Sequence, residues 1–362
     1  MFKSLFSGLF ALSCLCGLVS VRIQAAAQGQ AAPEPPKVTV DADGTVHVPA
    51  QVVPQSSFLT PEAKAYVTQH LIDMQNPEAV KQDAGVPRFM KPMLEWDRQN
   101  YALDRQDTKI AGVHVYVYTP KSGIAAENRK RVLINLHGGG FSGCWPACAE
   151  LESMPLSALM GMKVVSVDYR EGPEYKFPAA SEDVATVYKD LLKNYKPGGI
   201  GIYGCSAGGM LTAMSAAWFQ AHDIPAPGAI GIYCASAGGF GGDATSFAFP
   251  AGEARLAGNF GSGLMRLGYF SAADPKDPLV SPIESPAMLA KFPPTLLITG
   301  TRDFAFSGAL YTDTQLSRLG VDSELHVWEG LFHGFFYKAD VPESKDAFNV
   351  MIRFFDRHLA KD

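Results

Sequence analysis

A serine in a glycine-flanked turn is the side chain of this sequence best placed to act as a nucleophile. Ser206 is the serine of a G-x-S-x-G pattern at residues 204–208, which follows the apolar run Ile200-Gly201-Ile202. Residues 210–220 can continue as a helix. A strand, a sharp turn and a helix in this order present a hydroxyl at the tip of the turn, and the flanking glycines let the backbone segments pass close together. The pattern predicts Ser206 as a nucleophile.

A second serine competes for this role. Ser236 lies in Cys234–Gly238, after the strand-like run Ala229–Tyr233. A cysteine stands there in place of the first glycine, so a Cβ and a thiol would occupy the turn. Short Gly/Ser/Ala patterns also arise by chance in a chain with 35 glycines. The sequence favours Ser206 over Ser236.

Three consecutive glycines follow another strand-like run. Residues 131–136 are mostly apolar and lead directly into His137-Gly138-Gly139-Gly140-Phe141. Backbone N–H groups of such a loop can converge on one point, as the oxyanion of an acyl-transfer intermediate requires. A flexible loop or a phosphate cradle is the alternative, but no G-K-S or G-K-T follows and no G-x-G-x-x-G opens a helix. The loop therefore predicts acyl transfer.

A serine hydroxyl needs a base, and the base needs an acid that orients it. His333 lies in the loop Gly330–Phe335, directly after the last strand-like run. Asp303 is the first acid after the run Thr295–Thr299, and its alternative role is a helix N-cap. The three other histidines after Ser206 lie at a helix end, within a strand and on a helix (His222, His326 and His358). The chain order Ser206, Asp303, His333 is the order found in α/β hydrolases.

Strand-like and helical stretches alternate after about residue 110, which predicts a mostly parallel central sheet flanked by helices. Ile110–Tyr118 alternates as a half-exposed antiparallel outer strand would. The expected inner strands are Val132–Leu136, Lys163–Val167, Gly199–Tyr203, Ala229–Tyr233, Thr295–Thr299 and Glu324–Trp328. The expected helices are Ala179–Tyr195, Ala207–His222, Phe304–Leu319 and Ser344–Leu359.

Two regions interrupt this alternation. Residues 55–105 are expected to be helical and to form the N-terminal part of a cap, and residues 238–285 a second cap insertion. Surface decoration without contact to substrate is the alternative. The catalytic domain is expected to span residues 106–362.

The N-terminus has the features of a secretory signal peptide. Residues 1–27 begin with Lys3, continue with the apolar or small run 5–21 and end in three alanines. An uncleaved anchor is the alternative. We expect an exported protein, periplasmic or secreted, with no stable membrane span after processing. Residues 28–54 are expected to be a linker and N-terminal segment.

The net charge and the cysteines limit the partners and ligands that we expect this protein to bind. The formal net charge is −5 and the only basic cluster is Arg129-Lys130-Arg131, so nucleic acid is an unfavourable partner. Cys144 and Cys148 would form a local disulfide in an exported protein, or else two buried thiols. No Cys/His set has zinc-ligand spacing, and we expect neither a metal nor another cofactor.

Taken together, these motifs resemble the hormone-sensitive-lipase-like family of α/β-hydrolase esterases, from about Ile110 to the C-terminus. The glycine loop, the serine turn and His333-Gly334-Phe335 are joined by further matching segments: Asp168-Tyr169-Arg170, Gly172-Pro173-Glu174, Phe177–Ala180, Asp277-Pro278-Leu279 and Ser281-Pro282. The resemblance implies an α/β-hydrolase fold with a helical cap.

The resemblance also implies roles for single residues. The triad would be Ser206, Asp303 and His333, and the oxyanion hole would use the N–H groups of three residues (Gly139, Gly140 and Ala207). His137 would brace the glycine loop rather than act as a base. The implied activity is serine-dependent hydrolysis of small-molecule esters with short to medium acyl chains.

This chain departs from the family pattern at three places. Cys205 stands where the family usually has Asp, Phe304-Ala305-Phe306 follows Asp303 where Pro-Leu is more frequent, and residues 238–264 are rich in Gly and Phe. A lactonase, amidase or peptidase on the same triad is therefore an alternative. A catalytically silent binding protein is another, but such proteins typically lose a triad member.

Overall fold

The computed structural model of this protein describes residues 37–83, 85–254 and 268–360, in two separate units. In the first unit, which ends at Val52, β1 (Thr39–Val40) pairs antiparallel with β2 (Val46–His47). The second unit, from Val53 onward, holds all other described elements. The predicted signal peptide lies outside the described residues, and so does part of the second predicted cap insertion.

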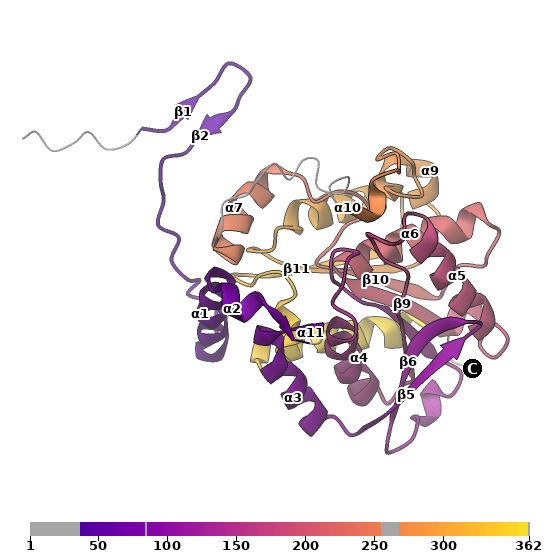
Figure 1. Cartoon of the computed structure of the whole chain (residues 1–362). Coiled ribbons are helices and arrows are strands. Elements are labelled where there is room, and N and C mark those ends of the chain that lie inside the picture. The colour runs from indigo at the N-terminus through magenta and orange to yellow at the C-terminus, as the bar shows by residue number, and fades with distance from the viewer. Residues whose placement is uncertain (1–36, 84, 255–267, 361–362) are drawn as a thin grey trace, which may run out of the picture. The chain divides into compact units, whose positions relative to one another are not determined.

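An eight-stranded sheet organises the second unit, with the strand order β12-β11-β10-β9-β7-β8-β6-β5 (Figure 1). Six neighbouring strands are parallel: β7 (Val132–Leu136), β8 (Val164–Val167), β9 (Ile200–Cys205), β10 (Ala229–Tyr233), β11 (Thr295–Gly300) and β12 (Ser323–Trp328). At one edge, β5 (Leu103–Ile110) and β6 (Val113–Pro120) run antiparallel. The mostly parallel sheet predicted from the sequence is confirmed.

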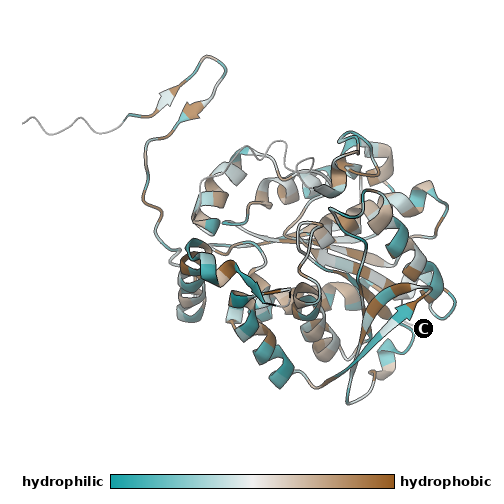
Figure 2. Cartoon of the chain, in the orientation of Figure 1, coloured by the Kyte–Doolittle hydropathy of each residue, from teal (hydrophilic) through white to brown (hydrophobic). Residues whose placement is uncertain are grey.

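Helices cover both faces of this sheet (Figure 1). One face carries α5 (Ala179–Leu191), α6 (Ala207–Ala221) and α10 (Phe306–Arg318), and the other carries α4 (Ala147–Met160) and α11 (Pro342–His358). Successive strand residues supply two separate cores: Ile202 packs in the first and Tyr203 in the second. The apolar strands therefore lie at the centre of the molecule, as the hydropathy colouring of Figure 2 shows.

The sequence did not predict one strand of the central sheet and one of the helices that cover it. The outer strand is β5, whose residues are mostly exposed and polar, and the predicted strand at 110–118 is its inner neighbour β6. Helix α4 is buried on nearly all sides and contains Pro155, so it lacks the apolar stripe that identifies a surface helix.

The N-terminal part of the second unit is mostly helical, as expected. It contains α1 (Pro61–Gln75), α2 (Pro77–Val80), the hairpin of β3 (Gln82–Asp83) and β4 (Val86–Pro87), and α3 (Lys91–Asn100). The Thr60 side chain caps α1 by accepting a hydrogen bond from the Ala63 N–H at 3.2 Å. The remaining described elements are α7 (Asp243–Glu253), α9 (Pro286–Leu289) and the 3-10 turns η1 (Arg88–Met90), η2 (Ala126–Asn128), η3 (Pro197–Gly199), η5 (Gly268–Phe270), η6 (Pro282–Glu284) and η7 (Phe335–Tyr337).

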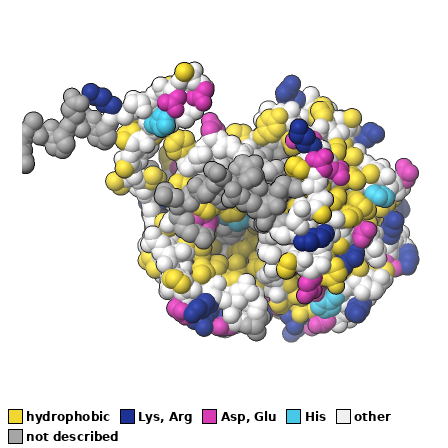
Figure 3. All heavy atoms as spheres, turned by 45° about the horizontal axis from the view of Figure 1, so that its top comes forward, with side chains coloured by type: hydrophobic (Ala, Val, Ile, Leu, Met, Phe, Trp, Pro, Cys, Tyr) yellow, Lys and Arg dark blue, Asp and Glu magenta, His cyan; other side chains and the backbone are white. Residues whose placement is uncertain are grey.

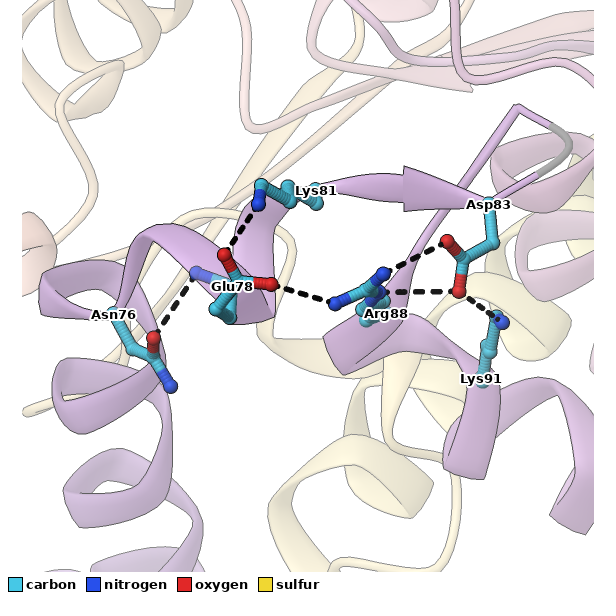
Figure 4. Close-up of polar contacts among 6 residues, drawn as sticks. All are labelled: Asn76, Glu78, Lys81, Asp83, Arg88 and Lys91. Carbon is cyan, nitrogen blue, oxygen red and sulfur yellow. Dashed lines mark hydrogen bonds and ion pairs between the residues drawn. The ribbon is translucent and has the colours of Figure 1, made fainter.

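A chain of ion pairs joins α2, the β3–β4 hairpin and α3 (Figure 4). Arg88 binds Glu78 at 2.8 Å and Asp83 at 3.1 Å, and Lys91 binds Asp83 at 2.7 Å. Exposed pairs of this kind stabilise a fold by only about 0–1 kcal/mol each. Their effect is to hold these short elements in register with one another.

The two predicted cap segments meet beside the loop that carries Asp303. His70 of α1 contacts the Gly252 carbonyl of α7 at 3.0 Å. The Arg302 guanidinium donates to the carbonyls of Pro54, at 2.6 Å, and Ala251, at 3.3 Å. The two segments therefore contact each other, and the second also contacts the residue before Asp303; their role as a cap is still a prediction. Within the described ranges, no helix is both long and apolar enough to cross a membrane.

The packing of the turn at Gly208 gives a test of the fold. A Cβ at Gly208 would lie 1.7 Å from the Leu136 carbonyl oxygen. We expect Gly208→Ala to lower the free energy of unfolding by roughly 2 kcal/mol or more, because overpacking outweighs the ~1 kcal/mol that alanine gains over glycine in a helix. Chemical denaturation measures this. Gly239→Ala is the control, since nothing lies within 4 Å of its Cβ position; equal stability of the two variants would contradict the packing.

Candidate active site

The turn between β9 and α6 holds Ser206 in a strained conformation. Its φ of 57° and ψ of −120° are unusual for a residue with a Cβ. Its N–H donates to the Tyr233 carbonyl at 2.8 Å. A Cβ at Gly204 would lie 2.1 Å from the Leu136 carbonyl oxygen, and one at Gly208 would lie even closer. Only glycine fits at both flanking positions, which explains the G-x-S-x-G pattern.

Asp303 and His333 form a hydrogen-bonded pair. The His333 Nδ1–H donates to Asp303 Oδ1 at 2.8 Å. Asp303 is fully buried, and it also accepts from the Thr299 hydroxyl at 2.8 Å and the Ala305 N–H at 2.8 Å. Because Nδ1 carries the proton in this bond, the neutral imidazole has its lone pair on Nε2.

The pair shifts both pKa values toward the charged forms. Burial alone would raise the pKa of Asp303, but the charge of His333 and the three hydrogen bonds outweigh it and lower that pKa. Burial alone would lower the pKa of His333, but the charge and hydrogen bond of Asp303 raise it above its ordinary value. The arrangement therefore favours an imidazole that can accept a proton.

An aromatic ring also lies against the histidine. Phe304 stacks on the His333 ring with centroids 4.0 Å apart and an interplanar angle of 22°. A ring face attracts a cation, and such contacts contribute about 0.5–2 kcal/mol. Phe304 thus stabilises a protonated His333 and fixes the plane of its ring.

The strand order brings these residues to one edge of the sheet. Ser206 follows β9, Asp303 follows β11 and His333 follows β12, and only β10 separates β9 from β11. Since these strands are parallel, their carboxyl ends meet at the same edge. The glycine loop follows β7, which neighbours β9 on its other side.

The glycine loop is held from beneath. The Gly138 N–H donates to the Glu152 carboxylate at 2.9 Å. Gly139 and Gly140 have φ values of 124° and 65°. Within the described residues, no acceptor faces the N–H of either glycine. Ala207 is the first residue of α6, so its N–H has no partner inside the helix.

His137 is part of the support of this loop. Its Nδ1 contacts the Gly138 carbonyl at 2.7 Å, and its ring stacks on Tyr169 with centroids 4.4 Å apart. The Tyr169 hydroxyl donates to the His137 carbonyl at 2.6 Å. Burial lowers the pKa of His137 to about 4, so it remains neutral near pH 7. These contacts agree with the predicted bracing role.

Cys144 and Cys148 form a disulfide, with Cα atoms 5.5 Å apart. Of the two alternatives left open by the sequence, the structure contains the disulfide rather than two thiols. The bridge joins the end of the glycine loop to the first turn of α4. A Cβ at Gly139 would lie 2.8 Å from the Cys144 Cβ, so the bridged segment packs directly against the loop.

The competing serine has a structural role. Ser236 is buried, and its hydroxyl contacts the carbonyls of Gly238 at 2.8 Å and Gly239 at 3.0 Å. A hydroxyl engaged in its own turn in this way is poorly placed to attack a substrate.

A thiol lies beneath the Asp303–His333 pair. Ligand atoms of Cys234, Asp303 and His333 lie within 4.8 Å of one another, a spacing that a metal ion could bridge. However, burial raises the pKa of Cys234 well above its ordinary value, which disfavours the thiolate that a metal needs. Its sulfur accepts a hydrogen bond from the Gly334 N–H at 3.2 Å. The cluster fits a proton-transfer pair better than a metal site.

One buried acid near the site was missed by sequence analysis. Glu152 of α4 lies beneath the glycine loop and contacts the turn before Ser206. The available signal was an acid within a largely apolar stretch, residues 147–160, but that stretch was not recognised as a helix.

A cavity of about 910 Å³ lies between α1, α2, α3 and residues 338–340. His70 and Tyr66 line it, and both also contact Phe332, the neighbour of His333, with ring centroids 3.6 and 5.0 Å apart. The lining of this cavity is thus connected to the loop that carries His333. Figure 3 shows one face of the molecule, on which hydrophobic side chains gather in a hollow.

Comparison with known proteins places the chain in a family. Residues 133–337 match the alpha/beta hydrolase fold family. The chain belongs to this family. The predicted membership of the α/β-hydrolase family is thereby confirmed, together with the predicted fold.

Curated relatives match parts of the chain. An acetyl-hydrolase of Streptomyces hygroscopicus is 28% identical over 61% of this chain and 73% of the relative. The carboxylesterase/phospholipase LipF of Mycobacterium tuberculosis is 29% identical over 58% of this chain and 57% of the relative. Arylacetamide deacetylase of Bos taurus is 32% identical over 36% and 37%, respectively. The chain thus spans about a third to three quarters of these relatives.

Solved structures match over most of the chain. The crystal structure of esterase E25 has a TM-score of 0.74 and 27% identity, and covers 87% of this chain and 99% of its own. A bacterial esterase of the hormone-sensitive lipase family has a TM-score of 0.69 and 22% identity, over 83% and 99%. The second likeness concerns the fold alone.

The pairing of His333 with Asp303 gives a test by titration. We expect NMR of the imidazole to give His333 a pKa above 6.5, so that it loses its proton only as the pH rises past that value. In Asp303→Asn the raising charge is gone, burial dominates, and the pKa should fall below 6.5. A wild-type pKa at or below 6.5, or one unchanged in the variant, would contradict the pairing.

Proposed function

We propose that this protein is a serine carboxylesterase in which Ser206, His333 and Asp303 form the catalytic triad. That it is a carboxylic ester hydrolase rests on its family and on the esterases it resembles. The serine mechanism rests on the site. The observation that carries it is the Asp303–His333 hydrogen bond of 2.8 Å at the sheet edge where Ser206 occupies a strained turn.

The proposed reaction has two stages. His333 Nε2 takes the Ser206 proton as Oγ attacks the ester carbonyl carbon, and Asp303 stabilises the imidazolium. The tetrahedral intermediate collapses, the leaving alcohol receives the proton, and an acyl-enzyme remains. Water then attacks the carbonyl carbon of the acyl-enzyme while His333 takes its proton. His333 returns this proton to Ser206 Oγ as the acyl bond breaks, and the acid is released.

The oxyanion of each intermediate needs donors that are not already used. The N–H groups of Gly139, Gly140 and Ala207 are proposed for this role, because the two loop glycines have no acceptor among the described residues and Ala207 begins a helix. The positive end of the α6 dipole adds to their effect. Removing one such donor typically slows acyl transfer roughly 100- to 1000-fold.

Short to medium acyl chains are the proposed substrates. Phe141, directly after the glycine loop, is fully buried and packs on Tyr269 and Phe270 with ring centroids 5.0 and 4.9 Å apart. In this proposal, the packed rings form one wall of a small acyl site beside the loop.

Amide hydrolysis on the same triad is the second candidate. It is favoured by the names of two relatives that match parts of the chain, arylacetamide deacetylase and kynurenine formamidase. Anilide and formamide substrates assayed beside esters distinguish the two. Faster hydrolysis of the amides would make this protein an amidase.

Export is part of the proposal. The Cys144–Cys148 disulfide supports it, because such bridges persist in oxidising compartments. Sequencing the N-terminus of the protein exported by its host tests this proposal. We expect processing near residue 27, and an intact Met1 would contradict cleavage.

Hydrolysis of p-nitrophenyl esters tests the nucleophile. Activity should fall as the acyl chain lengthens, and Ser206→Ala should lower kcat by roughly 10,000-fold or more, because the attacking oxygen is gone. Ser236→Ala is the matched control and should keep most of its kcat. Near-normal hydrolysis by Ser206→Ala would exclude the proposed mechanism.

A further inference from the structure

Glu152 is a buried acid that contacts several parts of the proposed site at once. It is only 2% exposed. Its Oε1 accepts from the Gly138 N–H at 2.9 Å and the Tyr337 hydroxyl at 2.7 Å. Its Oε2 accepts from the Asn135 amide at 2.8 Å and the Cys205 N–H at 3.3 Å.

Three of these four donors belong to different segments of the proposed site. Gly138 opens the glycine loop, Cys205 precedes Ser206, and Tyr337 lies in η7, which follows His333. One side chain therefore links three of the loops that carry the proposed catalytic groups.

The four contacts are complementary to an ionised carboxylate. Two backbone amides and the Asn135 side-chain amide can only donate here, and a carboxylate can only accept. Hydrogen bonds to a charged acceptor are about twice as strong as neutral ones. Burial raises the pKa of Glu152 to about 7, and the four hydrogen bonds oppose that rise.

A neighbouring acid shows what a merely structural role looks like. Glu150, two residues earlier on α4, is equally buried but forms ion pairs with Arg98 and Arg105. Among the described residues, Glu152 has no such cationic partner. Neutral donors stabilise the negative charge of Glu152. This charge in turn favours protonation of His333.

Glu152 also explains a departure in the sequence. Cys205 occupies the position before the nucleophile where the resembled family usually has Asp. The Cys205 side chain brings no carboxylate to this point, and Glu152 brings one from α4 to the Cys205 backbone.

We propose that Glu152 is a positioning residue of this enzyme. Its ionised carboxylate keeps the glycine loop, the Ser206 turn and the His333 loop in reactive alignment, and its negative charge assists proton transfer to His333. The inference rests on the proposed serine mechanism.

Glu152→Gln tests it in the full-length protein, with Glu150→Gln as the matched control. Glutamine keeps the shape, but it loses the charge and turns an NH₂ group toward a donor. We expect kcat on a p-nitrophenyl ester to fall roughly 10- to 100-fold with KM within about 3-fold, since alignment rather than substrate binding is lost. Glu150→Gln should keep its kcat even if its thermal stability falls.

The pH profile separates positioning from a purely structural role. In Glu152→Gln, the acid limb of kcat should move to lower pH, because His333 loses a neighbouring negative charge. In Tyr337→Phe, the carboxylate remains but one donor is gone, so the pKa of Glu152 rises and the limb should move to higher pH. This second variant removes a single oxygen and keeps the test available if Glu152→Gln folds poorly.

The outcomes are distinct. Acid limbs that shift in opposite directions support the proposal. The proposal is overturned if Glu152→Gln keeps the wild-type kcat and pH profile. It is also overturned if the variants lose activity only in proportion to the amount of folded protein. In both cases Ser206→Ala remains inactive, so the serine mechanism stands. Hydrolysis by Ser206→Ala in the same assay would overturn the proposed mechanism, and this inference with it.

Discussion

The close approach of the Ser206 turn to the end of β7 is the constraint on which the site depends. Cβ atoms at Gly204 and Gly208 would lie 2.1 and 1.7 Å from the Leu136 carbonyl oxygen. This contact fixes the turn against the strand that leads into the glycine loop. The nucleophile and the N–H groups proposed for the oxyanion are therefore positioned by one piece of backbone packing, before any side chain contributes.

Side chains then hold the histidine and the loops in place on this backbone arrangement. The Asp303–His333 pair and the ring of Phe304 hold the histidine, and Glu152 links its loop to the two others. Two departures from the family pattern have partners in the structure: Phe304 packs on the His333 ring, and Cys205 donates its N–H to an acid from another helix. The proposed chemistry is compatible with these different supporting residues.

Much of this site could be predicted from the sequence, because its residues follow apolar strands in short local patterns. The serine turn, the glycine loop, Asp303 and His333 each lie directly after a parallel strand, so sheet topology brings them to one edge. Glu152 could not be predicted, since its helix is buried on nearly all sides and shows no apolar stripe. Strand β5 was missed because an exposed outer strand has no apolar run, and the spacing of Cys144 and Cys148 alone did not establish the disulfide.

The most direct test of the account is to label the protein with a fluorophosphonate and locate the adduct by peptide mass spectrometry. The account predicts a single adduct on Ser206, formed far more slowly when His333 is replaced by alanine, because only that serine has an activating base. An adduct on Ser236, or no adduct on a protein that still hydrolyses esters, would contradict it.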